Sequence, residues 1–203
     1  IKVVHVVSSG KFARKVEEAG CDAVVCEGFE AGGHNGREET TTLVLIPQVR
    51  AATTLPLIAA GGIATGRGML AAMVLGAEGV QIGTRFVAST ESSGHQNFKD
   101  TIINMQEGDT MLSMKKVVPV RLIKNDFQKR IQEAEDRGAT KAELEEILGR
   151  ARAKKGMYEG DMAEGELEIG QIASFVKTIK PAGEIVQEIV QEFEAAKAEV
   201  ASL

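Results

Sequence analysis

A histidine inside a glycine-rich stretch offers the clearest chemistry in this sequence. His34 lies within the stretch 27–36, Glu-Gly-Phe-Glu-Ala-Gly-Gly-His-Asn-Gly, which directly follows the apolar run Ala23-Val24-Val25-Cys26. A short apolar run bounded by glycine is typical of a buried parallel strand. His34 is therefore expected on a loop at the carboxyl end of a strand, where barrel enzymes do their chemistry. The alternative is an ordinary turn with an incidental surface histidine.

Two further predicted strands end in glycines. The run 57–60 ends at Gly61-Gly62, and the run 79–82 ends at Gly83-Thr84. Glycines at such ends allow backbone N–H groups to approach a ligand, and the last loops of parallel barrels often bind phosphate. Thr84 adds a hydroxyl donor. Although two tight turns relieved by glycine would look similar, glycine at consecutive strand ends favours a phosphate site.

Four strand–helix units are expected before residue 90. The strands are predicted at 2–8, 23–27, 57–60 and 79–82, with helices between them. The inward-facing helix residues are expected to be Phe12, Ala13, Val16 and Ala19, then Leu43, Ile46, Val49 and Ala52, then Met69, Leu70, Met73 and Val74. Such alternation predicts parallel strands with right-handed crossovers. The sequence has no GxGxxG motif near its start, which argues against a dinucleotide-binding fold.

The expected fold class is α/β, a (β/α)8 TIM barrel of which this chain carries only the second half. A whole barrel needs about 250 residues, and strands 5–8 would occupy residues 1–90. Because an apolar strand begins almost at Ile1, it is expected to have neighbouring strands on both sides. Four strands alone would leave open edges, so a polypeptide of these residues is expected to self-associate or be unstable.

After Thr84 the pattern becomes helical and polar. Residues 91–180 are predicted to form a helical appendage, and residues 181–203 a C-terminal helix that packs back on the barrel. Leu122, Phe127, Ile131 and Ala134 would share one helical stripe. Thr140 to Glu143 form a capping-box pattern, which predicts a helix with Leu144, Ile147, Leu148 and Ala151 facing inward.

Composition excludes several classes of protein. The net charge of −5 argues against a general nucleic-acid binder. No apolar run is long enough to cross a bilayer, and no signal-peptide pattern is present, so no membrane role is expected. Cys21 and Cys26 suit neither a zinc site nor a redox pair. They are interpreted as reduced packing residues of a cytoplasmic protein, and no metal site is predicted.

Three motifs together resemble one family. Residues 30–36 (Glu-Ala-Gly-Gly-His-Asn-Gly), 59–64 (Ala-Ala-Gly-Gly-Ile-Ala) and 79–86 (Gly-Val-Gln-Ile-Gly-Thr-Arg-Phe) are similar to the flavin barrels of nitronate monooxygenases and type II, flavin-dependent enoyl-acyl carrier protein reductases. Residues 120–125 and 170–173 resemble the family's C-terminal part. The resemblance covers essentially the whole chain, but only about the C-terminal two-thirds of the family's usual length.

The resemblance implies flavin mononucleotide (FMN) over the strand ends. Its phosphate would sit on Gly61, Gly62, Gly83 and Thr84, with Gln81 and Ile82 lining the approach. Glu27 and Gly32 would border the flavin ring, and His34 would be the catalytic residue beside it. A histidine suits such a role because its unperturbed pKa lies near neutrality.

In detail the motifs look closer to the reductase branch. NAD(P)H would then supply a hydride, by way of FMN, to a trans-2-enoyl thioester, and His34 would stabilise the enolate or relay a proton. The alternative is a nitronate monooxygenase in which His34 acts as a base. A remoter one is a non-catalytic flavin-binding half-barrel. NADH versus NADPH, the chain length of the substrate and a role for a monovalent cation stay open.

The remaining candidates are weaker. His5 is expected in a packed strand wall and His95 at a helix start, neither with a functional role. A basic cluster could be a solvated helix face or a docking surface for acyl carrier protein; its members are Lys115, Lys116, Arg121, Lys124, Lys129 and Arg130. The expected partners are a carrier-linked or small-molecule substrate and a second copy of the chain in a homodimer.

Overall fold

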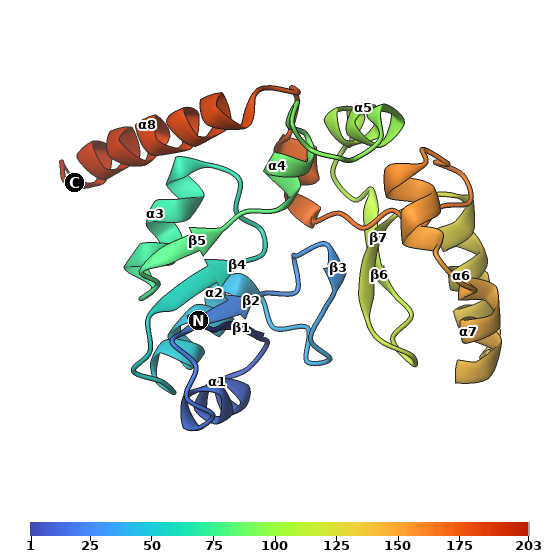
Figure 1. Ribbon diagram of the computed structural model, residues 1–203, viewed down its shortest axis with the longest axis horizontal. Helices are drawn as coiled ribbons and strands as arrows, with labels where there is room; N and C mark the ends of the chain where they lie inside the picture. The colour runs from blue at the N-terminus through green and yellow to red at the C-terminus, as the bar shows by residue number, and fades with distance from the viewer. Residues whose placement is uncertain (203) are drawn as a thin grey trace.

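A parallel sheet organises the N-terminal part of the protein. The computed structural model describes residues 1–202 (Figure 1). The sheet has four strands in the order β1-β2-β4-β5, namely β1 (Val4–Val7), β2 (Ala23–Glu27), β4 (Leu57–Ala60) and β5 (Gly79–Gln81). Each strand pairs parallel to the next, with Cys26 opposite Ala59 and Ala59 opposite Val80. In consequence, the carboxyl ends of β2, β4 and β5 meet at one edge of the sheet.

The predicted strand–helix alternation is confirmed for these strands. The helices that follow β1, β2 and β4 are α1 (Gly10–Glu18), α2 (Thr42–Arg50) and α3 (Gly66–Val74). Ser9 caps α1 and Thr65 caps α3, because each hydroxyl oxygen accepts a hydrogen bond from a backbone N–H three residues later. The core lies between sheet and helices, where Leu45, Ile46 and Val49 pack against buried β2 and β4 side chains.

Some predicted inward-facing helix residues are instead exposed. Phe12, Leu43 and Val74 all lie on solvent-facing positions. Leu43 is exposed because α2 begins at Thr42, so that Leu45, Ile46 and Val49 form its buried face. His5 is also exposed, since it lies on β1, an edge strand whose outer side has no strand partner within residues 1–202.

The described residues form no closed barrel. β1 and β5 are the two free edges of the four-stranded sheet, and four strands are too few to curl back on themselves. Val3, Val4 and Val6 on and beside β1 are exposed apolar residues. The observed architecture is an α/β fold with a parallel sheet, and the half-barrel interpretation stays a prediction.

A second, antiparallel sheet takes two of its strands from residues 91–180, the segment predicted to form a helical appendage. It has three strands in the order β3-β7-β6, where β3 is Gly33–His34, β6 is Thr110–Ser113 and β7 is Val120–Ile123. Leu122 therefore lies on a strand, and its expected place on a helical stripe was wrong. The β-branched run before and within β7 favours extended structure, and Pro119 cannot continue a helix.

Helices cover the far side of this second sheet. Phe127, Ile131 and Ala134 are buried on α6 (Asp126–Asp136), as predicted. The predicted capping box of Thr140 and Glu143 is present and begins α7 (Lys141–Leu148). Ala151 lies beyond the end of α7 in a positive-φ turn rather than inside the helix.

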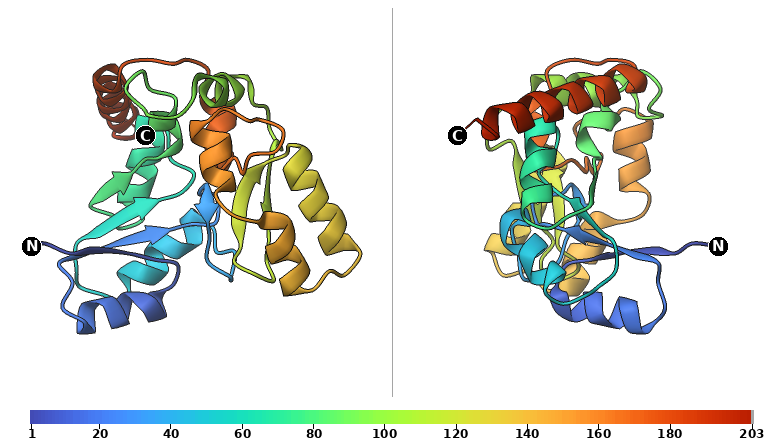
Figure 2. Two further views of the ribbon diagram at one scale, coloured as in Figure 1. Left: turned by 45° about the vertical axis from the view of Figure 1, so that its right-hand side comes forward. Right: turned by 90° about the vertical axis from the view of Figure 1, so that its left-hand side faces the viewer.

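The remaining elements are helices and helical turns outside the two sheets. They are the short helices α4 (Thr84–Val87) and α5 (Gln96–Asn104), the π-helical turn η1 (Lys154–Tyr158), the 3-10 turn η2 (Gln171–Phe175) and the long helix α8 (Ala182–Val200). Helix α8 crosses α3 (Figures 1 and 2), and Glu192 on α8 accepts a 2.8 Å hydrogen bond from Gly66 N. Leu203, the last residue of the predicted C-terminal segment, lies outside the described residues. Across residues 1–202, no helix combines the length and apolarity that a membrane span requires.

Candidate functional site

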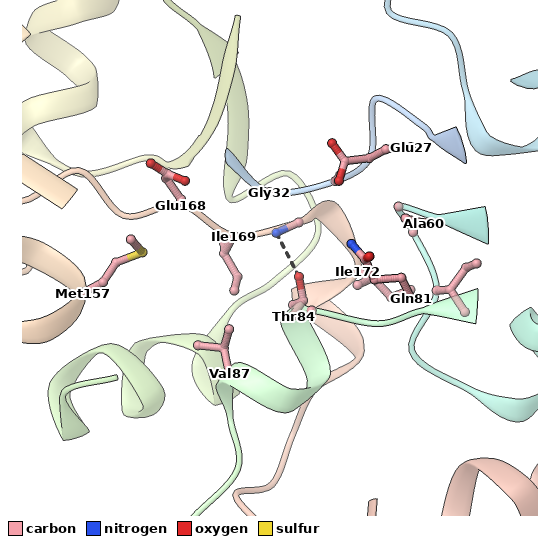
Figure 3. A pocket seen from close by; sticks show the side chains of 16 residues that line it. Glu27, Gly32, Ala60, Gln81, Thr84, Val87, Met157, Glu168, Ile169 and Ile172 are labelled. Atoms are coloured by element: carbon pink, nitrogen blue, oxygen red, sulfur yellow. Dashed lines mark hydrogen bonds between the residues drawn. The ribbon is translucent and has the colours of Figure 1, made fainter. Parts of the chain in front are cut away.

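A pocket of about 270 Å³ opens at the carboxyl ends of β2, β4 and β5 (Figure 3). Seven of the eight residues predicted to bind a cofactor line it: Glu27, Gly32, Gly61, Gly62, Gln81, Gly83 and Thr84. The register of the parallel strands explains the convergence, because it brings the three strand ends to the same level. Binding of a cofactor by these residues stays a prediction.

Ile82 is the predicted cofactor residue that does not line the pocket. Its side chain packs against the buried core cluster between the parallel sheet and its helices. Successive side chains of an extended chain point to opposite sides. Because Gln81 faces the pocket, Ile82 must face away from it.

The two glycine turns supply backbone donors to the pocket. Gly61 and Gly62 have φ of +93° and +68°, values that residues with a Cβ rarely adopt. A Cβ on Gly61 would also lie 2.7 Å from the carbonyl oxygen of Gly28. Within residues 1–202, the N–H groups of Gly62 and Gly83 donate to no other backbone group. Both are therefore available to an anionic ligand.

Thr84 can add a third donor. Its hydroxyl oxygen accepts a 3.1 Å hydrogen bond from the backbone N–H of Gly170 (Figure 3). Because that bond uses a lone pair on the oxygen, the hydroxyl hydrogen remains free to donate. The described residues that line the pocket include no lysine or arginine, so an anion here would depend on neutral donors.

A segment distant in sequence completes the pocket. Residues 168–170 and Ile172 form one wall together with Met157. Gln171 N donates to Glu30 O at 2.9 Å, which ties this segment to the loop after β2. A Cβ on Gly32 would lie 2.4–2.6 Å from backbone atoms of Ile169 and Gly170, so only glycine allows this approach. The sequence signal for this wall was the resemblance of 170–173 to the family, which did not assign a site to it.

The other lining residues that sequence reasoning missed are small or apolar. They are Ala31, Ala60, Ile63 and Val87. Each is a neighbour of a predicted site residue in sequence or on the next helical turn. No residue type among them indicates chemistry, so they could be found only through the fold.

Two carboxylates face the pocket, on either side of Gly32 in Figure 3. Burial raises the pKa of Glu27, which ends β2. Burial likewise raises the pKa of Glu168, and the nearby charge of His34 partly opposes that rise. A buried carboxyl with a raised pKa holds its proton to higher pH and can donate it.

His34 lies at the edge of this arrangement rather than in the pocket wall. It is on β3, where it pairs with Val120 of β7, and its side chain is exposed. Asn35 fixes the local chain, because its Nδ2 donates to the carbonyl oxygens of Ala31 and Gly33, each at 3.0 Å. The catalytic role of His34 stays a prediction.

The Arg121 side chain anchors the loop between β2 and β3 through hydrogen bonds to its backbone. Its side chain is buried, and its Nε and Nη2 donate to Phe29 O at 3.0 and 2.7 Å. The guanidinium also lies 5.0 Å from the centre of the Phe29 ring. Burial lowers the pKa of Arg121, while the charges of Glu30 and Glu39 oppose that change.

The predicted basic cluster is dispersed in the fold. Arg121 is buried, and Arg130 pairs with both carboxylate oxygens of Glu164 at 2.6 Å. Lys116 donates to Ala139 O at 2.7 Å. Lys124 is exposed beside Asp100 and Asp109 on a shallow groove. Four members of the cluster stay exposed, namely Lys115, Lys116, Lys124 and Lys129.

The two other histidines lie away from the pocket. His5 is on the exposed edge strand β1, and His95 caps α5 by accepting a hydrogen bond from Asn97 N at 3.1 Å. The position of His95 at the N-terminus of α5 confirms the helix start expected there. Within the described part of the chain, no group of three or more histidine, cysteine or acidic residues is arranged to hold a metal ion.

Comparison with known proteins gives a consistent result. The family model for nitronate monooxygenase matches residues 1–192. A probable nitronate monooxygenase of Staphylococcus saprophyticus is 40% identical over 148 residues, which cover 67% of this chain and 41% of the relative. One from Staphylococcus aureus is 44% identical over 121 residues, covering 56% of this chain and 34% of the relative. The chain thus spans less than half the length of these relatives.

Solved structures resemble nearly the whole chain. FabK from Thermotoga maritima matches with a TM-score of 0.93 and 42% identity, covering 99% of this chain and 63% of that one. Nitroalkane oxidase from Streptomyces ansochromogenes matches with a TM-score of 0.80 and 30% identity, covering 98% and 59%. The resemblance read from the three glycine-bearing motifs is confirmed.

Proposed function

The chain belongs to the nitronate monooxygenase family, and on that premise we propose that it is part of an FMN-dependent enoyl-acyl carrier protein reductase. The pocket at the ends of β2, β4 and β5 supports an oxidoreductase site there. The choice of reductase depends on one observation, the match to the enoyl-acyl carrier protein reductase FabK over 99% of the chain at a TM-score of 0.93.

We propose further that the fold is the second half of a (β/α)8 barrel. The chain covers 63% of FabK, and β1 presents exposed Val4 and Val6 along an unpartnered edge of the described sheet. Further strands along that edge would cover these side chains and would complete the wall of the pocket.

The residues of the pocket suit the phosphate end of FMN. Gly62, Gly83 and Thr84 all line this pocket, and a Cβ on Gly83 would meet nothing within 4 Å. A cavity of about 270 Å³ is slightly smaller than is usual for a whole drug-sized ligand. These residues would therefore hold only part of the cofactor, with Glu27 and Gly32 beside its ring.

Bound FMN would supply hydride chemistry between NAD(P)H and the substrate. The protein's own task is to hold the thioester, exclude water and deliver a proton to the carbon next to the thioester carbonyl. A donor near the carbonyl oxygen would also stabilise the charge that develops there. His34 is proposed for proton relay, because its side chain is exposed to solvent and an imidazole can both accept and donate a proton.

Nitronate oxidation is the second candidate, because the curated relatives at 40–44% identity carry that name. In that reaction His34 or a carboxylate would act as a base on the substrate. One pair of assays separates the candidates. Consumption of NAD(P)H in proportion to a crotonyl thioester supports the reductase, whereas oxygen uptake with propyl nitronate and no NAD(P)H supports the monooxygenase.

Replacing His34 with Ala tests its assignment in either reaction. FMN should be retained, because His34 does not line the pocket, while turnover should fall about 100-fold or more, as for loss of a general acid or base. Unchanged turnover would remove His34 from the mechanism. Absence of both activities in the wild type would point to a non-catalytic flavin carrier.

Docking of acyl carrier protein, a homodimer and a cytoplasmic location are proposals that accompany the reductase assignment. Lys124 and Lys129 are exposed cations that an acidic carrier could contact.

A further inference from the structure

The acidic group that reaches the pocket from the side of β3 is Glu168. Its side chain lines the cavity (Figure 3), whereas His34 is exposed and is not among the lining residues. A group that hands a proton to a bound substrate must contact the substrate's space. By that criterion Glu168 is better placed than His34.

The backbone fixes Glu168 in this position. Residues 166–169 run antiparallel to β7, with Ile123 N donating to Leu167 O at 2.9 Å and Glu168 bridged to Leu122. Leu167 and Ile169 point into the core with exposures of 1% and 2%. Because side chains alternate along an extended segment, Glu166 and Glu168 must point to the other side.

A glycine makes room for the carboxylate next to His34. A Cβ on Gly33 would lie 2.5 Å from Oε2 of Glu168, so the carboxylate occupies the space that a side chain there would need. Gly33 directly precedes His34 on β3. The Glu168 carboxylate therefore lies between the pocket and the backbone of the histidine strand.

The charges around Glu168 are few. His34 faces it from β3, Glu166 lies two residues away on the same segment, and Glu27 faces the pocket from β2. Arg152 acts on Glu166 rather than on Glu168. Burial raises the pKa of Glu168, and within the described residues its carboxylate has no ion pair or hydrogen bond that would hold it ionised.

We propose that Glu168 is the proton donor of this pocket and that His34 returns a proton to it from solvent. This role rests on the proposed reductase function. The β-carbon of the enoyl thioester gains a hydride that originates from NAD(P)H, and the α-carbon gains the proton of the Glu168 carboxyl. The carbon–carbon double bond becomes single, NAD(P)H becomes NAD(P)⁺, and the Glu168 carboxylate then regains a proton through His34.

The pairing of the two residues can be tested without turnover. Carbon-detected NMR titration of the full-length protein, with and without FMN, would follow the Glu168 carboxyl in the wild type and in His34→Gln. The midpoint should lie above that of a free glutamate and should rise further in His34→Gln, because a cationic neighbour is lost. A midpoint that does not move on removal of His34 would overturn the pairing.

The donor role is tested by kinetics of the flavin-loaded protein. Glu168→Gln keeps the shape of the side chain and should lower turnover about 100- to 10,000-fold without loss of FMN. Formate should partly restore turnover in Glu168→Ala, which a purely structural role would not allow. Glu166→Gln is the matched control, since Glu166 lies on the same segment but does not line the pocket.

The outcomes separate the two proposals. An active wild type whose turnover survives Glu168→Gln, or falls equally in Glu166→Gln, refutes the donor role and leaves the reductase intact. A wild type that reduces no enoyl thioester refutes the reductase and the donor role with it, and the titration alone then decides whether Glu168 and His34 interact.

Discussion

Gly32→Ala should disrupt the pocket by forcing two backbone segments apart. The new Cβ would lie 2.4 Å from Ile169 C and 2.6 Å from both Ile169 Cα and Gly170 N. Real Cβ contacts are longer than 3.0 Å, so these atoms must separate by at least about half an ångström. No side-chain rotation can relieve the clash, because all three atoms belong to the backbone.

The expected cost is at the upper end of the usual overpacking range, about 3 kcal/mol. For a chain of this size that corresponds to a Tm about 6–12 °C lower. FMN binding should weaken as well, because the displaced residues form one wall of the pocket. Differential scanning fluorimetry and a flavin fluorescence titration would measure the two effects.

Gly183→Ala is the control for this substitution. A Cβ on Gly183 meets nothing within 4 Å, and the residue lies in the first turn of α8, where alanine is the better helix former. Its Tm should stay the same or rise slightly. If Gly32→Ala matched this control in Tm and FMN affinity, the close approach of the loop to residues 169–170 would be refuted.

Three further predictions concern other residues. Arg121→Met should lower the free energy of unfolding by about 2–3 kcal/mol and weaken FMN binding, because Phe29 O loses two charged donors. A variant whose urea unfolding curve matches that of the wild type would contradict this prediction. Burial and the charge of Glu168 raise the pKa of Glu166 to about 7, above its unfolded value. The folded state therefore binds more protons, and stability falls as pH rises through the window from about 4.5 to 7. Glu166→Gln should accordingly raise Tm more at pH 8 than at pH 5, and an equal change at both would refute the assignment. Reversing Lys124 and Lys129 to Glu should raise KM for a carrier-linked substrate but not for a free thioester, and equal effects would exclude carrier docking.

The amino-acid sequence determined the parallel strands and the pocket's glycine turns. Apolar runs such as 23–26 and 57–60 are short and end in glycine, and that local pattern is sufficient to predict strands and the side on which their ends meet. The conformation of Gly61 and Gly62 is likewise a local property, since their positive φ excludes most other residues. The family followed from the same three motifs.

Only the tertiary structure decided what lies opposite those turns. β3 and β7 pair residues that are almost ninety positions apart, such as Gly33 and Arg121, and no local periodicity reports such a pairing. The same long-range contacts bury Arg121 and bring Glu168 to the pocket wall. They also place Leu122 in a strand, where the sequence pattern had predicted a helix. A carboxylate gains a raised pKa only through the neighbours that desolvate it, and the fold alone supplies those neighbours.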